Sequence, residues 1–219
     1  MLSSPIGSLD EIFSDGLQNG IITEISGLRG TGKTQIALQF SIEPLRNNKK
    51  ILFIDTTVEF RPERFLQILQ SRNLSTSLLD NLHISRVTNT QKQIEILNNI
   101  DIDDFSLLII DNIADLFSFE YSKKEYLNKK NTNFSNYMIS LSKLALSKNL
   151  PIIITNQILS HDDKNYERMY AQLENYIHQK IQLEKIKNSY TCKILSPFIH
   201  ETKFHYKITN FGIEETQSI

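Results

Sequence analysis

The segment 27–34 carries residue types that bind phosphate. It reads GLRGTGKT and matches the pattern G-x-x-x-x-G-K-[ST] in full. The glycines let backbone N–H groups curve around anionic oxygens, and the helix expected after the segment adds positive charge at its N-terminus. Lys33 would reach the terminal phosphates, and the Thr34 hydroxyl would ligate Mg²⁺. The predicted nucleotide-binding residues here are Gly27, Leu28, Arg29, Gly30, Thr31, Gly32, Lys33, Thr34 and Gln35.

A metal site needs a second anchor beside Thr34. Asp111 directly follows the apolar run LLII, and an aspartate at the carboxyl edge of a parallel sheet would hold the water shell of Mg²⁺. Taken alone, an acid at a strand end is more often a helix cap or turn residue, but the phosphate loop favours a metal role. Gln157 ends the run PIIITNQ at the same edge and would sense the γ-phosphate through its amide, with a plain loop amide as the alternative.

The elements that position these residues follow from the hydrophobic pattern. Apolar, β-branched runs predict strands at 21–26, 49–55, 82–87, 105–111 and 151–157. Helical spacing predicts helices at 35–43, 62–72, 91–100 and 133–145, with Pro44 ending or kinking the first. A polar stretch follows Gln157, and then 176–186, 189–195 and 202–208 alternate like antiparallel strands. The pattern predicts an α/β fold with a mainly parallel central sheet flanked by helices and C-terminal antiparallel strands.

Composition limits the class of protein. The 219 residues are 40% hydrophobic and 22% charged, which fits a single domain over 1–219. The net charge of -1 gives no support from global charge for a nucleic-acid or membrane protein. One cysteine excludes an intramolecular disulfide and favours a reducing compartment. No apolar run approaches the about 20 residues of a membrane helix. We expect a cytoplasmic protein, nucleoid-associated in a prokaryote or nuclear in a eukaryote, with no membrane partner.

The motifs GLRGTGKTQ, ILFIDTTVEFRPER, LLIIDN and IIITNQ stand in an order that resembles the ATPase core of the RecA/RadA recombinase family, including its eukaryotic strand-exchange members. The likeness covers almost the whole chain. ITEISG and FRPER are more specific to this family than the phosphate loop, which many unrelated NTPases share. The resemblance implies a RecA-like P-loop NTPase fold and the cofactors ATP and Mg²⁺.

The chain departs from the family at its N-terminus. With only residues 1–20 before the first predicted strand, we expect no N-terminal helical DNA-binding domain like that of full recombinases. The chain thus resembles a core-only paralog, similar to archaeal RadB and to the eukaryotic recombinase paralogs. The resemblance implies an ATP·Mg-binding protein that assists homologous recombination and DNA repair, with a main RecA/RadA-type recombinase or another paralog as its partner.

Two regions bear on DNA binding. The segment 158–174 is short, polar and without glycine, where the family has a long DNA-binding loop, so DNA gripping there is not expected. The segment 121–130 stands at the family's first DNA-binding loop and carries tyrosines beside lysines that would contact phosphates of single-stranded DNA. These lysines are Lys123, Lys124, Lys129 and Lys130. A solvated lysine-rich loop is the alternative.

The expected catalytic base is missing. In RecA-type ATPases a glutamate two residues after the strand-ending aspartate polarises the attacking water, and FRPER aligns that position with Thr57. Glu59 would face the same side as position 57 in an extended segment and could approach the water, while a solvated loop acid is the alternative. Asp55 is expected to cap the turn or to orient water rather than to attack. We therefore predict weak or no hydrolysis, DNA-dependent if present, with Glu59 and Gln157 as catalytic candidates.

Arg64 is the remaining candidate for nucleotide binding. In the family pattern its guanidinium packs on the adenine ring, a role that a planar cation can fill. An exposed helix arginine is the alternative.

Two other function classes remain open. A KaiC-like signalling or regulatory ATPase shares the core and does not act on DNA. A small-molecule kinase ranks last, since the chain has no arginine-rich lid segment. Salt-dependent binding to single-stranded DNA through the four lysines would argue against the signalling class.

Overall fold

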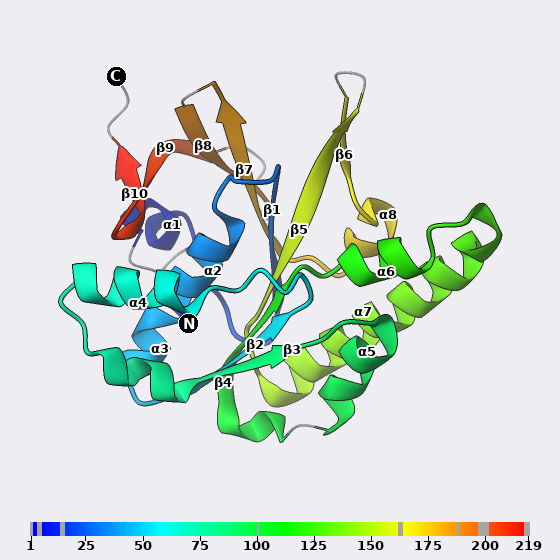
Figure 1. The fold of residues 1–219 in the computed structure, drawn as a ribbon, viewed down its shortest axis with the longest axis horizontal. Helices are drawn as coiled ribbons and strands as arrows, with labels where there is room; N and C mark the ends of the chain where they lie inside the picture. Colours follow the sequence, from blue (N-terminus) through cyan, green and yellow to red (C-terminus); the bar gives the residue numbers. More distant parts are fainter. Residues whose placement is uncertain are drawn as a thin grey trace.

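The computed structural model describes residues 2–3, 6–13, 16–99, 101–161, 164–187, 189–196 and 202–216, which form a ten-stranded sheet in the order β10-β9-β8-β7-β1-β5-β4-β2-β3, with β6 paired to β5 (Figure 1). The strands are β1 (Ile22–Gly27), β2 (Lys50–Asp55), β3 (Leu82–Arg86), β4 (Phe105–Asp111), β5 (Ile152–His161), β6 (Lys164–Glu167), β7 (Gln179–Ile186), β8 (Ser189–Ser196), β9 (Thr202–Thr209) and β10 (Gly212–Thr216).

The sheet is parallel in its centre and antiparallel at one end. β1 pairs in parallel with β5 and β7, and β4 pairs in parallel with β5 and β2, which continues to β3. From β7 onward, β8, β9 and β10 add as antiparallel neighbours. The predicted α/β fold with C-terminal antiparallel strands is therefore confirmed.

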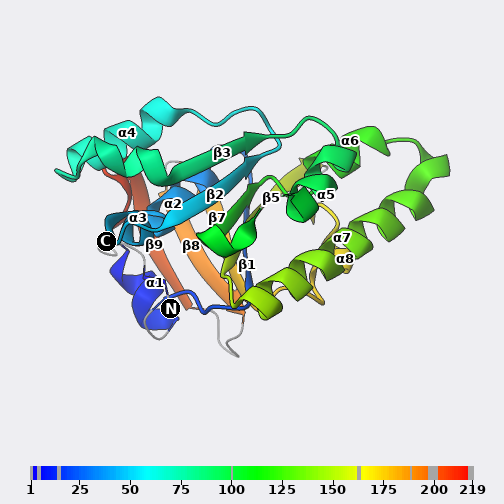
Figure 2. The same cartoon turned by 90° about the horizontal axis from the view of Figure 1, so that it is seen from below.

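Helices cover both faces of the sheet (Figure 2). The helices are α1 (Gly7–Ile12), α2 (Lys33–Phe40), α3 (Ile42–Arg46), α4 (Pro62–Ser71), α5 (Thr90–Asn99), α6 (Asp115–Glu120), α7 (Leu127–Lys148) and α8 (Tyr170–Leu173), with short 3₁₀ turns η1 (Thr76–Asn81), η2 (Ile102–Asp104) and η3 (Lys124–Tyr126). Residues of α1 to α4 bury one hydrophobic cluster against the sheet, and residues of α5 to α8 bury a second cluster on the opposite face. None of the described helices has the length and apolar character needed to cross a bilayer.

The central strands read as continuous apolar runs because both of their faces are buried. In β4, Leu107 and Ile109 belong to the cluster under α1 to α4, whereas Leu108 and Ile110 belong to the cluster under α5 to α8. Side chains alternate between the faces along a strand, so a strand covered on both sides needs apolar residues at every position. This arrangement brings the polar strand ends to one edge of the sheet.

Several element boundaries differ from the sequence prediction. The first helix breaks at Ser41, three residues before Pro44, since the proline ring would clash with the carbonyl of Phe40 in a continuous helix; Pro44 lies in the first turn of α3 instead. α7 begins at Leu127 rather than at residue 133. Its first turn is mostly exposed and, apart from Leu127, polar, and it lies beyond the core, so it has no apolar periodicity (Figure 1).

The polar stretch after Gln157 is also regular structure. β5 continues to His161 and pairs with β6 in an antiparallel hairpin that projects from the sheet, and α8 follows (Figure 1). The hydrophobic pattern predicts only a polar stretch at 158–174, with no strand or helix assigned to it. Helix α1 and strand β10 had no counterpart in the sequence prediction.

Candidate nucleotide-binding site

The carboxyl ends of four parallel strands meet at one edge of the sheet. Gly27 at the end of β1 lies opposite Gln157 of β5, and Asp55 at the end of β2 lies opposite Asp111 of β4. A pocket of about 890 Å³ opens at this edge. Its lining includes ten of the sequence-predicted site residues, namely Arg29, Gly30, Gly32, Lys33, Thr34, Gln35, Glu59, Arg64, Asp111 and Gln157. The fold therefore brings together residues far apart in the sequence, at the edge where α/β sheets bind ligands.

The phosphate loop joins β1 to α2 in a conformation that requires glycine. Gly30 and Gly32 have φ angles of 78° and 94°, which residues other than glycine rarely adopt. A Cβ on Gly27 would lie 2.6 Å from the carbonyl oxygen of Leu183 and 2.7 Å from Oγ1 of Thr31. Thr31 is buried beneath the loop and donates its hydroxyl to the carbonyl of Leu28 at 2.8 Å. The backbone of the phosphate loop is therefore held in a tight curve before α2.

Lys33 lies over this curve. Its Nζ donates to the carbonyl oxygens of Gly27 and Leu28, both at 3.0 Å. Burial lowers the pKa of Lys33, while the carboxylates of Asp111 and Asp115 raise it. A desolvated ammonium held only by neutral carbonyls gains from an anionic partner. The position of Lys33 therefore suits a phosphate group bound in the loop.

Thr34 and Asp111, the two predicted metal ligands, are in direct contact. The Thr34 hydroxyl donates to Oδ2 of Asp111 at 2.6 Å, and Thr155 donates to its other oxygen. Burial raises the pKa of Asp111, whereas both hydroxyl donors and Lys33 lower it. No group of three His, Cys, Asp or Glu side chains suited to a metal ion exists among the described residues. This donor pair fits Mg²⁺, which takes few protein ligands and fills its shell with phosphate oxygens and water.

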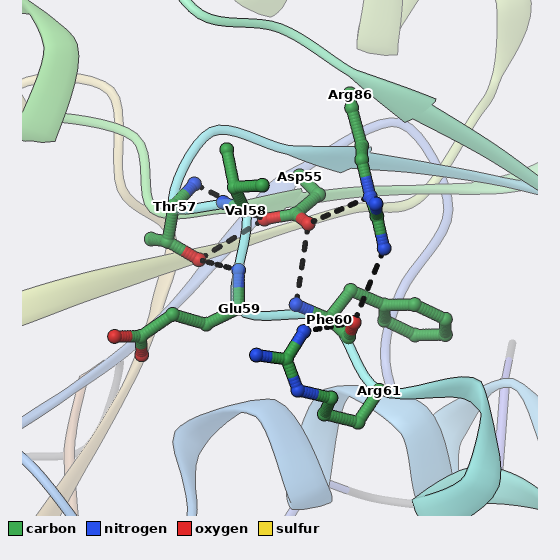
Figure 3. A network of polar contacts seen from close by, with 7 residues as sticks. All are labelled: Asp55, Thr57, Val58, Glu59, Phe60, Arg61 and Arg86. Carbon is green, nitrogen blue, oxygen red and sulfur yellow. Dashed lines mark hydrogen bonds and ion pairs between the residues drawn. The ribbon is translucent and has the colours of Figure 1, made fainter.

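Asp55 organises the loop between β2 and α4 (Figure 3). Its buried carboxylate accepts hydrogen bonds from the backbone N–H groups of Thr57 at 3.0 Å, Val58 at 2.8 Å and Phe60 at 3.2 Å. The Arg86 Nε atom lies 3.7 Å from its Oδ2. The prediction that Asp55 caps the turn is therefore confirmed, and its lone pairs are committed to the loop rather than to a substrate.

The position of the missing base belongs to the same loop. The Thr57 hydroxyl donates to Asp55 at 3.0 Å and accepts from the N–H of Glu59 at 3.2 Å, so this side chain supports the turn (Figure 3). Val58 has a φ of 59°, in the left-handed region. The segment is thus not extended, and the expectation that Glu59 faces the same side as residue 57 for that reason is wrong.

Glu59 nevertheless lines the pocket, where it contacts the phosphate loop. Its Oε1 lies 2.8 Å from Nη2 of Arg29, and both side chains are mostly exposed, 63% for Glu59 and 79% for Arg29. The carboxylate of Glu59 is therefore paired with an arginine of the phosphate loop.

Arg64 and Gln157 bound other parts of the pocket. Arg64 donates through Nε to Oε1 of Gln35 at 2.7 Å and through Nη2 to the carbonyl of Thr209 at 2.5 Å, which joins α4 to α2 and to the turn between β9 and β10. Gln157 is half-buried on β5 beside the phosphate loop. Both roles stay predictions.

The four candidate DNA-binding lysines do not line the pocket. Lys123 and Lys124 are exposed at η3, but Lys129 and Lys130 lie in the first turn of α7, so the prediction of one loop over 121–130 is wrong for this pair. The Nζ of Lys129 lies 5.9 Å from the centre of the Tyr121 ring. A helical turn of mostly exposed lysines with an adjacent aromatic ring remains compatible with a nucleic acid surface.

Among the residues of the pocket wall that sequence reasoning missed, two charged side chains form an ion pair. Asp115, the first residue of α6, and Arg168, between β6 and α8, form an ion pair with 2.9 Å between Oδ1 and Nη1. Asp115 lies four positions after Asp111, a spacing that could have drawn attention to it. Arg168 carried no sequence signal, because its place depends on the hairpin that returns the chain to the pocket.

Comparisons with known proteins agree on one family. The Rad51 family model matches residues 1–216. The chain is 28% identical over 228 residues to the DNA repair and recombination protein RadB of Thermococcus sibiricus, covering 100% of this chain and 97% of that protein. It is 26% identical to the DNA repair and recombination protein RadA of Methanococcus maripaludis, over 98% of this chain and 76% of that protein. It is also 26% identical to the DNA repair and recombination protein RadA of Ignicoccus hospitalis, over 96% of this chain and 71% of that protein.

These matches confirm the resemblance to the RecA/RadA family and to a RadB-like paralog. They also support a role in recombination and DNA repair. Because the family model spans nearly all of its residues, the chain belongs to the Rad51 family.

Proposed function

We propose that this chain binds ATP·Mg²⁺ at the pocket and assists a RecA/RadA-type recombinase or another paralog in homologous recombination and DNA repair. The observation that carries the nucleotide proposal is the set of contacts of Lys33, whose half-buried ammonium donates to the carbonyls of Gly27 and Leu28 within the phosphate loop. Membership of the Rad51 family supports the recombination role and speaks against the KaiC-like alternative.

Each predicted residue has a place in this proposal. The loop 27–35 holds the phosphates, and Thr34 with Asp111 holds Mg²⁺. Bound Mg²⁺ supplies charge neutralisation at the phosphates. Arg64 contacts the adenine at the end of the pocket that the β9–β10 turn closes, and Gln157 senses the terminal phosphate from β5.

Slow hydrolysis follows from the loop between β2 and α4. Thr57 cannot accept a proton at neutral pH, and its hydroxyl is committed to Asp55 and to the backbone of Glu59. Glu59 is the nearest substitute, but its carboxylate is held by Arg29 at 2.8 Å. Without a positioned general base, turnover falls by about 10²- to 10⁴-fold. The protein would act mainly as a nucleotide-binding switch.

The proposed partners follow from membership of the Rad51 family and from the lysines near η3 and the start of α7. The recombinase role calls for contact with another member of the family, and the lysines at η3 and the start of α7 provide positive charge for single-stranded DNA. Organisation of 1–219 as one ATPase core domain is part of the same proposal.

A strand-exchange assay tests this function. A RadA-type recombinase is assayed with and without this chain, in the presence of ATP or of ADP. We expect stimulation that depends on ATP and is absent with the Lys33→Ala variant. Equal strand exchange with and without the chain, together with unchanged repair of double-strand breaks after deletion of the gene, would contradict the recombination role.

A further inference from the structure

Arg168 presents unused hydrogen-bond donors at the pocket wall. Its guanidinium is three-quarters buried and donates through Nη1 to Asp115 at 2.9 Å. Its Nε–H is buried and has no hydrogen-bond partner among the residues that the structure describes. A guanidinium has five N–H donors, and a buried donor without a partner carries a cost of about 1–3 kcal/mol. Because Arg168 itself lines the pocket, a ligand bound there can supply acceptors to its guanidinium.

The surroundings of Arg168 indicate which part of a nucleotide it would meet. Its carbonyl accepts a hydrogen bond from Asn156, the neighbour of Gln157, and Gln157 lies opposite Gly27 of the phosphate loop. Gln157 and Asp111 line the same pocket. Arg168 therefore belongs to the side of the pocket that holds Lys33 and the predicted metal ligands, whereas Arg64 and Thr209 form another side.

A buried polar cluster fixes the backbone that carries Arg168. Asn156, the neighbour of Gln157 on β5, donates through Nδ2 to the carbonyl of Arg168 at 2.9 Å and to Oε1 of Glu24 at 3.0 Å. The Lys180 Nζ atom lies 3.0 Å from Oε2 of Glu24 and 2.5 Å from Oε2 of Glu167, the residue before Arg168. Arg168 follows a projecting hairpin. Its position is nevertheless fixed by Asn156, which bonds to its carbonyl, and by Lys180, which pairs with the preceding residue Glu167.

We propose that Arg168 donates to the terminal phosphate of bound ATP and makes the site prefer a nucleoside triphosphate to a diphosphate. The inference rests on the proposed nucleotide binding and adds to it a residue from the hairpin side of the pocket. In the absence of nucleotide, Asp115 holds the guanidinium in place. A terminal phosphate brings more negative charge than one carboxylate and offers acceptors to the free N–H groups. Planar guanidinium geometry suits this contact better than an ammonium does.

The Asn156 contact gives the proposal a consequence for the hairpin. Because Asn156 of β5 donates to the carbonyl of Arg168 at 2.9 Å, the residue that would contact the phosphate is anchored at the base of the β5–β6 hairpin. The hairpin stands where the family places its long DNA-binding loop.

Binding of two nucleotides tests the proposal. A non-hydrolysable ATP analogue and ADP, each with Mg²⁺, are titrated into the wild type, Arg168→Gln and Arg168→Lys by calorimetry. Loss of a charged hydrogen bond predicts a roughly 10- to 100-fold weaker affinity of Arg168→Gln for the ATP analogue, with ADP affinity within about twofold of wild type. Arg168→Lys should fall between the two. Lys148→Ala, which removes the cation of the ion pair with Asp103, is the matched control and should bind both nucleotides like wild type.

The outcomes separate the two levels of proposal. If wild type binds neither nucleotide, the proposed function fails. If wild type binds both but Arg168→Gln keeps the same ratio of affinities, Arg168 is only a structural ion pair between α6 and the chain after β6, and the inference is overturned. Circular dichroism and thermal unfolding of each variant confirm that the fold is intact. Arg168→Gln retains a donor for Asp115, so it is the variant best suited to preserve the fold.

Discussion

The carboxylate of Glu59 lies 2.8 Å from the guanidinium of Arg29, so the acid that could substitute for the missing base is paired with a residue of the phosphate loop. Both side chains are mostly exposed, and such a pair contributes little to stability, about 0–1 kcal/mol. Its importance is one of position: Glu59 is directed to the pocket mouth, and Thr57 is turned toward Asp55. Neither is arranged as a general base.

Restoring an acid at position 57 should raise turnover. We expect Thr57→Glu to increase ATP hydrolysis by about tenfold or more, since a positioned general base contributes at least about 10²-fold and part of that gain is lost with the Thr57 hydroxyl bonds. Thr57→Gln, similar in size but uncharged, is the matched control and should not gain activity. Steady-state phosphate release measures all variants. Glu59→Gln should stay within about twofold of wild type, and abolition of a brisk activity by this change would show that Glu59 is the base.

Removal of the Asp55 carboxylate should destabilise the loop before α4. In Asp55→Asn an amide N–H₂ would face backbone N–H groups that donate to a carboxylate oxygen in the wild type. We therefore expect a loss of about 2 kcal/mol in the free energy of unfolding. Urea denaturation measures the change. Asp80→Asn, at an exposed position, should change it by less than about 0.5 kcal/mol. Equal effects of the two substitutions would mean that the network in Figure 3 does not hold the loop.

Much of this site could be predicted from local sequence. The ends of β1, β2 and β4 at Gly27, Asp55 and Asp111 were predictable because buried parallel strands read as apolar runs that stop at a polar residue. The directions of the Thr57 and Glu59 side chains, which follow the end of β2, were not predictable. They depend on the left-handed backbone at Val58, which β-branched residues rarely adopt and which no local pattern indicates.

Other features depend on contacts between distant segments. Glu24 lies in the middle of an otherwise ordinary strand, and its buried partners Asn156 and Lys180 come from β5 and β7. The hairpin of β5 and β6 has mostly polar residues because it projects from the core, so it has no apolar alternation to reveal it. Arg168 reaches the pocket only through this hairpin. A sequence pattern indicates burial along one segment. The surroundings of Glu24 and Arg168 are formed by several segments that lie far apart in the sequence.

Glu24 should make stability depend on pH. Burial raises the pKa of Glu24 from 4.5 to about 8. The folded state then holds a proton that the unfolded chain releases, so the stabilising contribution of Glu24 is present in full below pH 4.5 and is lost as the pH rises through about 8. Glu24→Gln cannot ionise. Relative to wild type, we expect its free energy of unfolding to increase by more than about 1 kcal/mol between about pH 5 and about pH 9.

Urea unfolding of both proteins at the two pH values measures this difference. Glu63→Gln, at an exposed position in the first turn of α4, is the control and should show no such change. A pH-independent difference between wild type and Glu24→Gln would contradict a raised pKa for Glu24.

The lysines near η3 should determine any binding to single-stranded DNA. Changing Lys123, Lys124, Lys129 and Lys130 to Glu should weaken such binding strongly and reduce its dependence on salt, because each phosphate contact contributes about 0.7 to the logarithmic slope. Fluorescence anisotropy at several salt concentrations measures the slope. The matched control changes four other exposed lysines to Glu, namely Lys49, Lys92, Lys143 and Lys207. Equal losses in both variants would point to net charge rather than to a specific surface.

The central claim is that the pocket binds ATP·Mg²⁺ through Lys33, and calorimetric titration of ATP with Mg²⁺ tests it most directly. We predict saturable binding to the wild type and an affinity about 10- to 100-fold weaker for Lys33→Ala, because its charged hydrogen bonds to phosphate are lost. Lys49→Ala, at an exposed position on the turn before β2, should bind like wild type. Absence of ATP binding to the wild type, or equal affinities of Lys33→Ala and Lys49→Ala, would contradict the claim.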